Sequence, residues 1–376
     1  MKCKLTPITL CHVGSGNTLK RNVDFVADGD KLGIVDVRKI FDIVGVDGIA
    51  GWCSAIDRRE NILNYVRGYK PNAQLRDICS TILEVENGHS EPNNVKELRE
   101  HIRSLGVPYI PASSLKGAIA TAILAADPYD SKLKIPEKIN KKNNCVVDKF
   151  FSKAEKSKKN DRVFYTPQTS VLRFLRVSDA YFNGVPTMAM YCNQLNIRKG
   201  KELRESKTQQ YIEGFYTDEP AIIDLDIKSG YMHNVSRKGM IGEIPKAMTS
   251  IKELLTTINA HTLRLLKIEK DFWSDSDHVN IEDYLDQIDK LIDACQSCKE
   301  KEGRAAIIRV GYGSGWDSIT GGWSKESAND DEWDRIVNAS RPKNKENYLE
   351  YYFPKTRRVF DAYMPLGFMR IEIAEK

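Results

Sequence analysis

Residues 109–124, with the sequence YIPASSLKGAIATAIL, constrain the fold of this 376-residue chain more than any other stretch. Ser113 and Ser114 follow an extended segment and are good N-cap residues, because a hydroxyl accepts the amide protons that are free in a first helical turn. Lys116 and Gly117 then lie in that turn, where free amides and the positive helix end attract an anion such as phosphate. An ordinary capped core helix explains the same residues, so both interpretations stay open. The apolar residues recur at helical spacing and predict one buried helix face: Leu115, Ile119 and Ala122 or Ile123.

The chain is mildly basic, with a formal net charge of +5 and a sequence pI of about 8.6. This balance permits nucleic-acid binding without requiring it, since a local patch matters more than the total charge. No run of about 18 apolar residues predicts a membrane helix, and the N-terminal residues lack the pattern of a signal peptide. The eight cysteines are scattered, and Cys295 and Cys298 form one CxxC pair without the second pair of a zinc site. We therefore expect a cytoplasmic protein with reduced thiols, no bound metal and no cofactor.

A short glycine motif, Gly14-Ser15-Gly16, follows the first predicted strand. A strand that runs into such a turn directs consecutive backbone amides into a small concavity that can hold a phosphate. Hairpin turns use the same residues, so the motif alone is weak evidence. His12 borders the turn and is a candidate general acid or base, although a lone histidine more often has a structural or RNA-stacking role.

A second glycine segment follows a predicted strand at residues 307–310. Neither a Gly-Lys-Ser/Thr sequence nor a βαβ context with a distal carboxylate accompanies it, which argues against a nucleotide-hydrolysing loop and a dinucleotide site. We expect Gly313, Ser314 and Gly315 to form a cradle of backbone amides. Trp316 beside it either stacks on a base or anchors the loop to the core.

Several basic residues are candidates for contact with an anionic partner. Arg173 opens an alternating stretch that predicts a strand over residues 173–180, and Lys355, Arg357 and Arg358 form a compact cationic cluster near the C-terminus. A basic turn is predicted at residues 198–201. The lysine-rich stretch at residues 131–161 is either a solvated surface insertion or a contact for RNA or a neighbouring RNA-bound subunit.

Hydrophobic periodicity and glycine or proline punctuation predict the remaining elements. We expect mostly helices over residues 52–105 and two further amphipathic helices at residues 246–269 and 280–300. The predicted β structure comprises a hairpin at residues 24–37 and strands within 189–196, 209–225 and 367–373.

Five motifs occur in one order along nearly the whole chain: HVGSG, YIPASSLKGAIATAIL, LRVSDA, GYGSGWDS, and PKTRRV followed by PLGFMRIEI. Together they resemble the RAMP superfamily of CRISPR proteins and, more narrowly, the fifth Csm subunit of type III-A interference complexes. The chain departs from the family pattern at Ala112, where many RAMP proteins have glycine, and at Ala120, where the family often has arginine. The lysine-rich stretch has no counterpart that can be aligned.

The resemblance implies an α+β fold of two ferredoxin-like, RRM-type RAMP modules with a helical insertion and with glycine-rich loops at their interface. On this basis, residues 1–180 form an N-terminal module with a helical insertion at about 52–105 and a lysine-rich insertion at about 131–161. Residues 181–376 form a C-terminal RAMP-like module with a helical segment at about 246–300.

The resemblance also implies a function. On this resemblance, the family member is expected to bind crRNA through the sugar-phosphate backbone, to cap its 3′-proximal end and to support crRNA maturation in antiviral defence, and it does not cleave target RNA. The implied partners are crRNA, a neighbouring Csm backbone RAMP subunit, the small helical Csm subunit and host ribonucleases during maturation, with no membrane. The candidate RNA-binding residues are Gly14, Ser15, Gly16, Ser113, Ser114, Lys116, Gly117, Arg173, Gly313, Ser314, Gly315, Trp316, Lys355, Arg357 and Arg358.

Two enzymatic alternatives remain. A RAMP endoribonuclease that processes precursor crRNA needs a general base and a cation, which His12 and Lys116 could supply. A metal-dependent nuclease would use carboxylates such as Asp24, Asp36 or Asp179, although nothing in the sequence shows that any pair of them converges.

Overall fold

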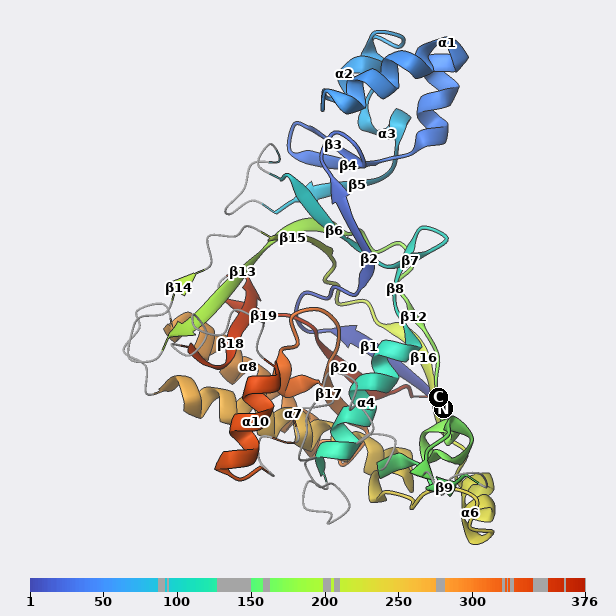
Figure 1. Cartoon of the computed structure of the whole chain (residues 1–376), viewed down its shortest axis with the longest axis vertical. Helices are drawn as coiled ribbons and strands as arrows, with labels where there is room; N and C mark the ends of the chain where they lie inside the picture. Colours follow the sequence, from blue (N-terminus) through green and yellow to red (C-terminus); the bar gives the residue numbers. More distant parts are fainter. Residues whose placement is uncertain are drawn as a thin grey trace.

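A computed structural model gives the fold of the chain (Figure 1). The molecule is elongated: helices lie at one end, β-sheets occupy the middle, and a small lobe with helix α6 (Ser229–Arg237) lies at the other end. Within the described part of the chain, none of the helices combines the length and apolarity needed to span a bilayer. The structure describes residues 1–86, 92, 95–126, 150–157, 163–198, 204–205, 210–274, 281–319, 322, 324, 328–340, 351–361 and 363–375.

One sheet has five antiparallel strands and includes both ends of the chain. Strand β1 (Lys2–Pro7) is central, and its Cys3 lies opposite Ile223 on one side and Ile373 on the other. The strands come from both sides of residue 180, and the division of the chain into two modules at that point stays a prediction. In spatial order the strands are β11 (Leu175–Val177), β16 (Ala221–Ile227), β1 (Lys2–Pro7), β20 (Phe368–Ile373) and β17 (Ala305–Arg309).

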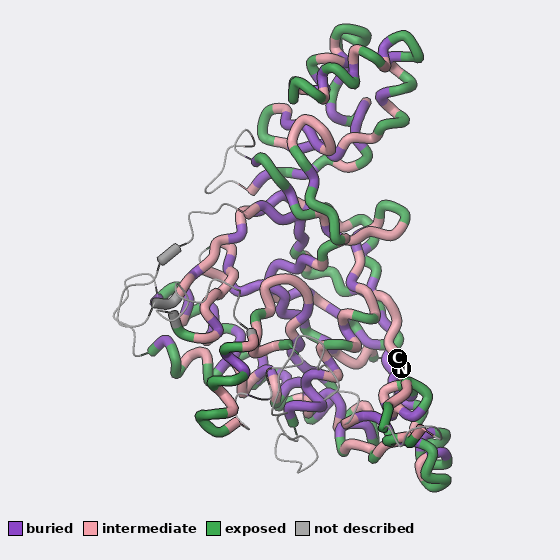
Figure 2. The backbone as a smooth tube through the Cα atoms, in the orientation of Figure 1, coloured by how far each residue is buried: buried purple, intermediate pink, exposed green. Residues whose placement is uncertain are grey.

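Helices α4 (Ala112–Ala126) and α7 (Ile251–Ser274) cover one face of this sheet. Burial alternates along β1, so that Cys3 and Leu5 face these helices while Lys2 and Lys4 are exposed. Helix α8 (Ile281–Glu300) packs on the alternate residues of β17 in a second core. The buried backbone is accordingly concentrated around these elements (Figure 2). The predicted central helix with its buried face and the two predicted amphipathic helices are confirmed.

The larger sheet links the middle of the molecule to its helical end (Figure 1). The predicted hairpin at residues 24–37 is confirmed as β3 (Phe25–Asp28) and β4 (Lys31–Val35), which are joined by a turn that contains Gly29. The main path runs β2 (Gly14–Lys20), β6 (Glu97–His101), β15 (Gln210–Gly214), β13 (Met188–Arg198), β5 (Cys79–Val85), β4 (Lys31–Val35) and β3 (Phe25–Asp28), and β18 (Tyr351–Phe360) pairs with β13.

The prediction of helices over residues 52–105 is wrong beyond residue 78. Three helices, α1 (Val37–Asp57), α2 (Ile62–Arg67) and α3 (Leu75–Ile78), form a cap with its own apolar core. The chain then enters β5, where alternate residues are buried. Pairing with β4 and β13, which are distant in the sequence, outweighs the local helical periodicity.

The predicted strand at residues 173–180 also needs correction, because Arg173 lies in a 3-10 turn (Val171–Phe174) and β11 begins only at Leu175. Most of the lysine-rich stretch and of the basic turn at residues 198–201 lie outside the described residues. The remaining elements are short: β7 (Arg103–Ser104), β8 (Val107–Ile110), β9 (Glu155–Lys156), β10 (Val163–Phe164), β12 (Ala180–Tyr181), β14 (Arg204–Glu205), β19 (Met364–Pro365), α6 (Ser229–Arg237), α10 (Asp330–Ser340) and 3-10 turns at Pro167–Thr169, Lys246–Met248 and Trp316–Ser318.

Candidate nucleic-acid interface

The two glycine segments that the sequence singled out meet in space. The backbone N–H of Tyr312 donates to the carbonyl of His12 over 2.9 Å. At Gly311, with φ +87°, an added Cβ would lie 2.4 Å from the same carbonyl oxygen. Only glycine permits this approach, because any side chain would push the loop away from His12. The loop at residues 311–315 is therefore fixed against the segment that leads into β2.

The N-terminal glycine motif is not the turn that we predicted. Gly14 opens strand β2 opposite His101, and the register is irregular between Gly14 and Thr18. The hydroxyl of Ser15 donates to the Glu100 carboxylate over 2.8 Å. A carboxylate at this distance disfavours a phosphate beside Ser15, so this motif supports the neighbouring loop rather than forming a separate cradle.

The second glycine segment is a loop held from the inside by Arg309. Its guanidinium donates from Nη2 to the carbonyl of Gly313 and from Nε to the carbonyl of Leu366, both over 3.0 Å. Trp316 ends the loop and packs edge to face on Trp333 and Phe353, with ring centroids 5.6 and 5.1 Å apart. Of the two roles considered for Trp316, these contacts favour the anchor.

Two arginines converge on the tyrosine at the centre of this loop. The guanidinium carbon of Arg358 lies 4.4 Å from the ring centroid of Tyr312, and that of Arg99 lies 5.3 Å from it. The Tyr312 hydroxyl donates to Gln210 over 2.5 Å, which fixes the ring. Among the described residues, neither arginine forms an ion pair, and the buried Nε of Arg358 has no hydrogen-bond partner. The positive charges of Arg99 and Arg358 thus lie at the same ring, and no carboxylate among the described residues neutralises them.

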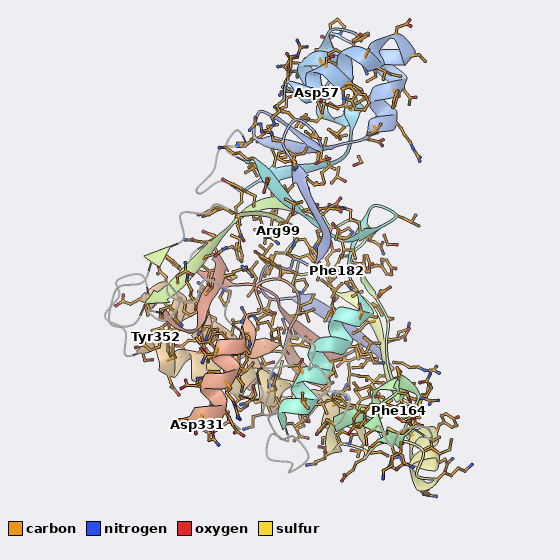
Figure 3. All side chains as sticks on the ribbon, viewed as in Figure 1. Asp57, Arg99, Phe164, Phe182, Asp331 and Tyr352 are labelled. Carbon is orange, nitrogen blue, oxygen red and sulfur yellow. The ribbon has the colours of Figure 1, made fainter. Side chains whose placement is uncertain are left out.

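A groove of about 530 Å³ runs between the glycine loop and strand β18. Figure 3 shows Tyr352 on the β18 side and Arg99 towards β2 and β15. Lys355 and Arg358 bring positive charge to the groove, and burial lowers the pKa of Lys355. Cations, aromatic rings and exposed glycine backbone are the features that bind a sugar-phosphate chain. The groove is lined by residues 311–316, Ile319, residues 352–356 and Arg358.

The predicted cationic cluster at residues 355–358 is divided between two environments. Arg357 points away from the groove and forms a two-pronged ion pair with Glu269, with nitrogen–oxygen distances of 2.6 and 2.9 Å. Burial alone would raise the pKa of Glu269, but the charge and hydrogen bonds of Arg357 outweigh it and lower that pKa to about 2. Arg357 therefore forms a buried ion pair in the core, whereas Arg358 lines the groove.

The start of helix α4 differs from the prediction. The helix begins at Ala112, whose N–H donates to the Asp179 carboxylate over 2.6 Å, so Asp179 replaces Ser113 or Ser114 as the cap. Lys116 donates from Nζ to the carbonyl of Leu175 over 3.0 Å, and burial lowers its pKa. A carboxylate already occupies the helix end, which weakens the case for an anion there. Gly117 is exposed, and a Cβ added to it would meet nothing within 4 Å.

The three carboxylates considered for a metal nuclease each accept a hydrogen bond from a backbone amide. Asp24 accepts from the N–H of Lys20 over 2.8 Å, Asp36 caps α1, and Asp179 caps α4. Within the described ranges, no group of three histidine, cysteine or carboxylate side chains is arranged to hold a metal ion.

His12 lies inside the protein with 2% of its surface exposed. Its Nδ1 is 2.5 Å from the carbonyl oxygen of Glu213, and burial lowers its pKa. The ring packs edge to face on His101, whose own pKa burial lowers to about 3. The Glu213 side chain is fully buried and paired with Arg103. This cluster supports the loop from below and exposes no histidine to a ligand.

The structure thus brings together part of the predicted site. The groove contains Gly313, Ser314, Gly315, Trp316, Lys355 and Arg358, while Arg173 lies in a different lobe near α6. Sequence reasoning missed Arg99 and Tyr312. Tyr312 had a signal, since it is the large side chain between two glycines, but Arg99 lay in a stretch predicted to be helical.

The chain is similar in sequence to one protein family and in fold to solved structures. The sequence profile of the RAMP superfamily matches residues 4–358. A chain of a solved Csm–crRNA–target RNA ternary complex of a type III-A CRISPR-Cas system shares the fold with a TM-score of 0.70 and 16% identity, over 99% of this chain and 100% of that one. The crystal structure of T. onnurineus Csm5 superposes with a TM-score of 0.61 and 15% identity, over 97% of this chain and 99% of that one. No curated protein matches the sequence.

Proposed function

The chain belongs to the RAMP superfamily, and from this premise we propose that it is an RNA-binding subunit of a type III-A CRISPR (Csm) interference complex. In this proposal it acts in the cytoplasm, caps the 3′-proximal end of the crRNA and supports crRNA maturation in antiviral defence. Its partners are the neighbouring Csm backbone RAMP subunit and the small helical Csm subunit, with host ribonucleases taking part in maturation. The shared fold with a Csm complex chain and with Csm5 supports this assignment.

The convergence of Arg99 and Arg358 on Tyr312 is the observation that carries the proposal. A nucleic acid supplies a phosphate for two guanidinium groups that have no carboxylate partner among the described residues. The adjacent loop has glycines at Gly313 and Gly315, which let a sugar-phosphate backbone come close. Contacts of this kind follow the RNA backbone and carry no base code.

The strand order supports a ferredoxin-like module. Along the chain, β1 is followed by α4, β11, β16, α7 and β20, and in space the strands lie in the order β11-β16-β1-β20. This is a βαββαβ arrangement to which β17 and α8 are added. We infer that the five-stranded sheet is one of the two modules, and that it draws on both sides of residue 180.

We propose further that the chain is not itself an enzyme. A metal-independent ribonuclease needs a base within reach of the 2′-hydroxyl. His12 is buried against Glu213, and Lys116 is bonded to the carbonyl of Leu175, so both candidates have internal partners. Incubation of the full chain with repeat RNA in EDTA tests this point, and site-specific cleavage products would show a processing endoribonuclease instead.

Binding of crRNA as a function of salt tests the groove. Each phosphate contact that is lost lowers the slope of log K against log salt by about 0.7 for single-stranded RNA. We expect Arg99→Ala with Arg358→Ala to lower it by about 1.4. The matched control is Arg38→Ala, an exposed arginine on α1 at the far end of the molecule, which should leave the slope unchanged. An unchanged slope in the double variant would contradict the proposal.

A further inference from the structure

The end of the molecule opposite the helical cap forms a separate lobe around α6 (Figure 1). We define this α6 lobe as residues 150–157, 163–174 and 228–248. Its segments are joined by backbone hydrogen bonds: the N–H of Gly242 donates to the carbonyl of Thr169, and the N–H of Lys228 donates to the carbonyl of Phe174, both over 3.0 Å. The lobe is therefore one continuous surface, although its pieces are far apart in the sequence.

The α6 lobe is strongly basic. Its only carboxylates among the described residues are Glu155 and Glu243. Two of its cations have carboxylate partners outside the lobe, Lys228 with Asp226 and Lys246 with Glu253. The other cations are all exposed: Lys153, Lys156, Arg173, Arg237 and Lys238.

Aromatic rings stand among these charges. The buried side chain of Phe174 contacts both an exposed aromatic ring, that of Tyr231, and an exposed cation, that of Arg173. The ring of Tyr231, 61% exposed, meets Phe174 edge to face with centroids 5.7 Å apart, and the Arg173 guanidinium carbon lies 5.1 Å from the Phe174 centroid. Phe164, labelled at this end of Figure 3, is 42% exposed.

Arg173 and Lys153 donate to the backbone carbonyls of Gln168 and Gly239, but they have no carboxylate partner among the described residues. Exposed rings beside such cations fit one kind of ligand. A base stacks on an aromatic face while its phosphate meets a cation, and neither contact depends on sequence. An acidic protein segment would pair with the cations, but its carboxylates would not stack on the exposed ring of Tyr231. Tyr231 and Arg173 both pack on Phe174, which places an exposed ring and an exposed cation in the same patch of the lobe.

We infer that the α6 lobe is a second RNA-binding surface, on which an unpaired base stacks on Tyr231 and an adjacent phosphate contacts Arg173. The choice of RNA as the ligand rests on the proposed function. The surface is distinct from the groove at the glycine loop, and it takes single-stranded RNA because a duplex keeps its base faces stacked internally.

The test separates the two surfaces by first disabling the groove. The full chain carrying Arg99→Ala and Arg358→Ala is titrated with a fluorescent single-stranded oligouridine, and anisotropy reports the remaining binding. In this background we expect Tyr231→Ala to weaken binding at least about fivefold. Arg173→Ala should lower the salt slope by about 0.7. Thermal unfolding of each variant checks that the fold is kept.

Two controls isolate the contacts. Tyr231→Phe keeps the ring and should bind like its parent, whereas Tyr69→Ala removes a 49% exposed tyrosine from the distant helical cap and should have no effect. If neither Tyr231→Ala nor Arg173→Ala changes binding, the inference is overturned. Binding of polyglutamate that is insensitive to Tyr231→Ala would overturn it in favour of an acidic protein partner. If the groove variants bind like wild type while Tyr231→Ala still weakens binding, the groove proposal fails and the α6 lobe stands.

Discussion

Two neighbouring arginines on β18 should respond to mutation in opposite ways. Arg357→Ala removes the partner of Glu269, and the side chains of this pair are only 12% and 17% exposed. Glu269 also accepts hydrogen bonds from Tyr284 and Trp273, each over 2.8 Å. These neutral donors remain in the variant, but the buried carboxylate loses its counter-charge. We expect a loss of about 3–5 kcal/mol in the free energy of unfolding at pH 7.

The pH dependence gives an independent measure of the same pair. Burial raises the pKa of Glu269, but Arg357 and the hydrogen bonds lower it to about 2, below the ordinary value of 4.5. A carboxylate with a lowered pKa in the folded state stabilises above its unfolded pKa, and this stability is lost as the pH falls towards 2. The difference corresponds to about 3 kcal/mol. The gap between wild type and Arg357→Ala should therefore narrow as the pH falls below about 4.5.

Urea unfolding followed by tryptophan fluorescence measures the stability, and RNA binding is measured on the same preparations. Arg358→Ala is the matched control, since it removes an adjacent arginine that packs on Tyr312. We expect it to cost about 1–2 kcal/mol, the scale of a partly buried cation–π contact, and to weaken RNA binding. If Arg357→Ala lost less than about 1 kcal/mol and instead flattened the salt dependence of RNA binding, Arg357 would face the ligand and our account of the pair would be refuted.

Three further predictions concern the supports of the site. Gly311→Ala should destabilise the fold more than Gly315→Ala. A Cβ at residue 311 would lie 2.4 Å from the His12 carbonyl oxygen, whereas a Cβ at residue 315 would meet nothing within 4 Å. Equal losses of stability in urea unfolding would contradict this. Lys116→Ala should cost about 1 kcal/mol, because the Leu175 carbonyl loses its donor, and should leave the salt slope of RNA binding unchanged; a flatter slope would instead place Lys116 on the RNA. Burial, with the nearby charges of His12 and Arg103, lowers the pKa of His101 to about 3 in the folded state. Because the unfolded state then binds a proton at higher pH than the folded state does, the free energy of unfolding should fall by about 1.4 kcal/mol per pH unit below about 6.5. The decrease should be smaller in His101→Phe.

Elements with strong local signals were predictable from the sequence. Helices α4, α7 and α8 each have an apolar stripe, and the hairpin of β3 and β4 has its Asp-Gly turn. Strands β5 and β6 were missed because their partners are distant: Arg99 lies between Thr18 of β2 and Ile212 of β15. No local pattern reports such pairing.

The candidate site shows the same limit. The loop at residues 311–315 was predictable because several glycines follow a buried strand. Its contact with His12 was not, since it depends on how the N- and C-terminal strands come together. Nor can a sequence tell which of two adjacent arginines faces a carboxylate, here Glu269, on a helix elsewhere in the chain.

The central position of β1 has a consequence for synthesis on the ribosome. The ribosome makes β1, Lys2–Pro7, before the intervening residues 8–367, and it makes the neighbouring strand β20, Phe368–Ile373, only after them. At about 5–20 residues per second, one edge of β1 waits roughly half a minute for its partner. An open strand edge invites pairing with other nascent chains, and charged side chains such as lysine oppose it. We expect Lys2 and Lys4, which alternate with the buried Cys3 and Leu5, to keep this edge from aggregating until β20 has been made.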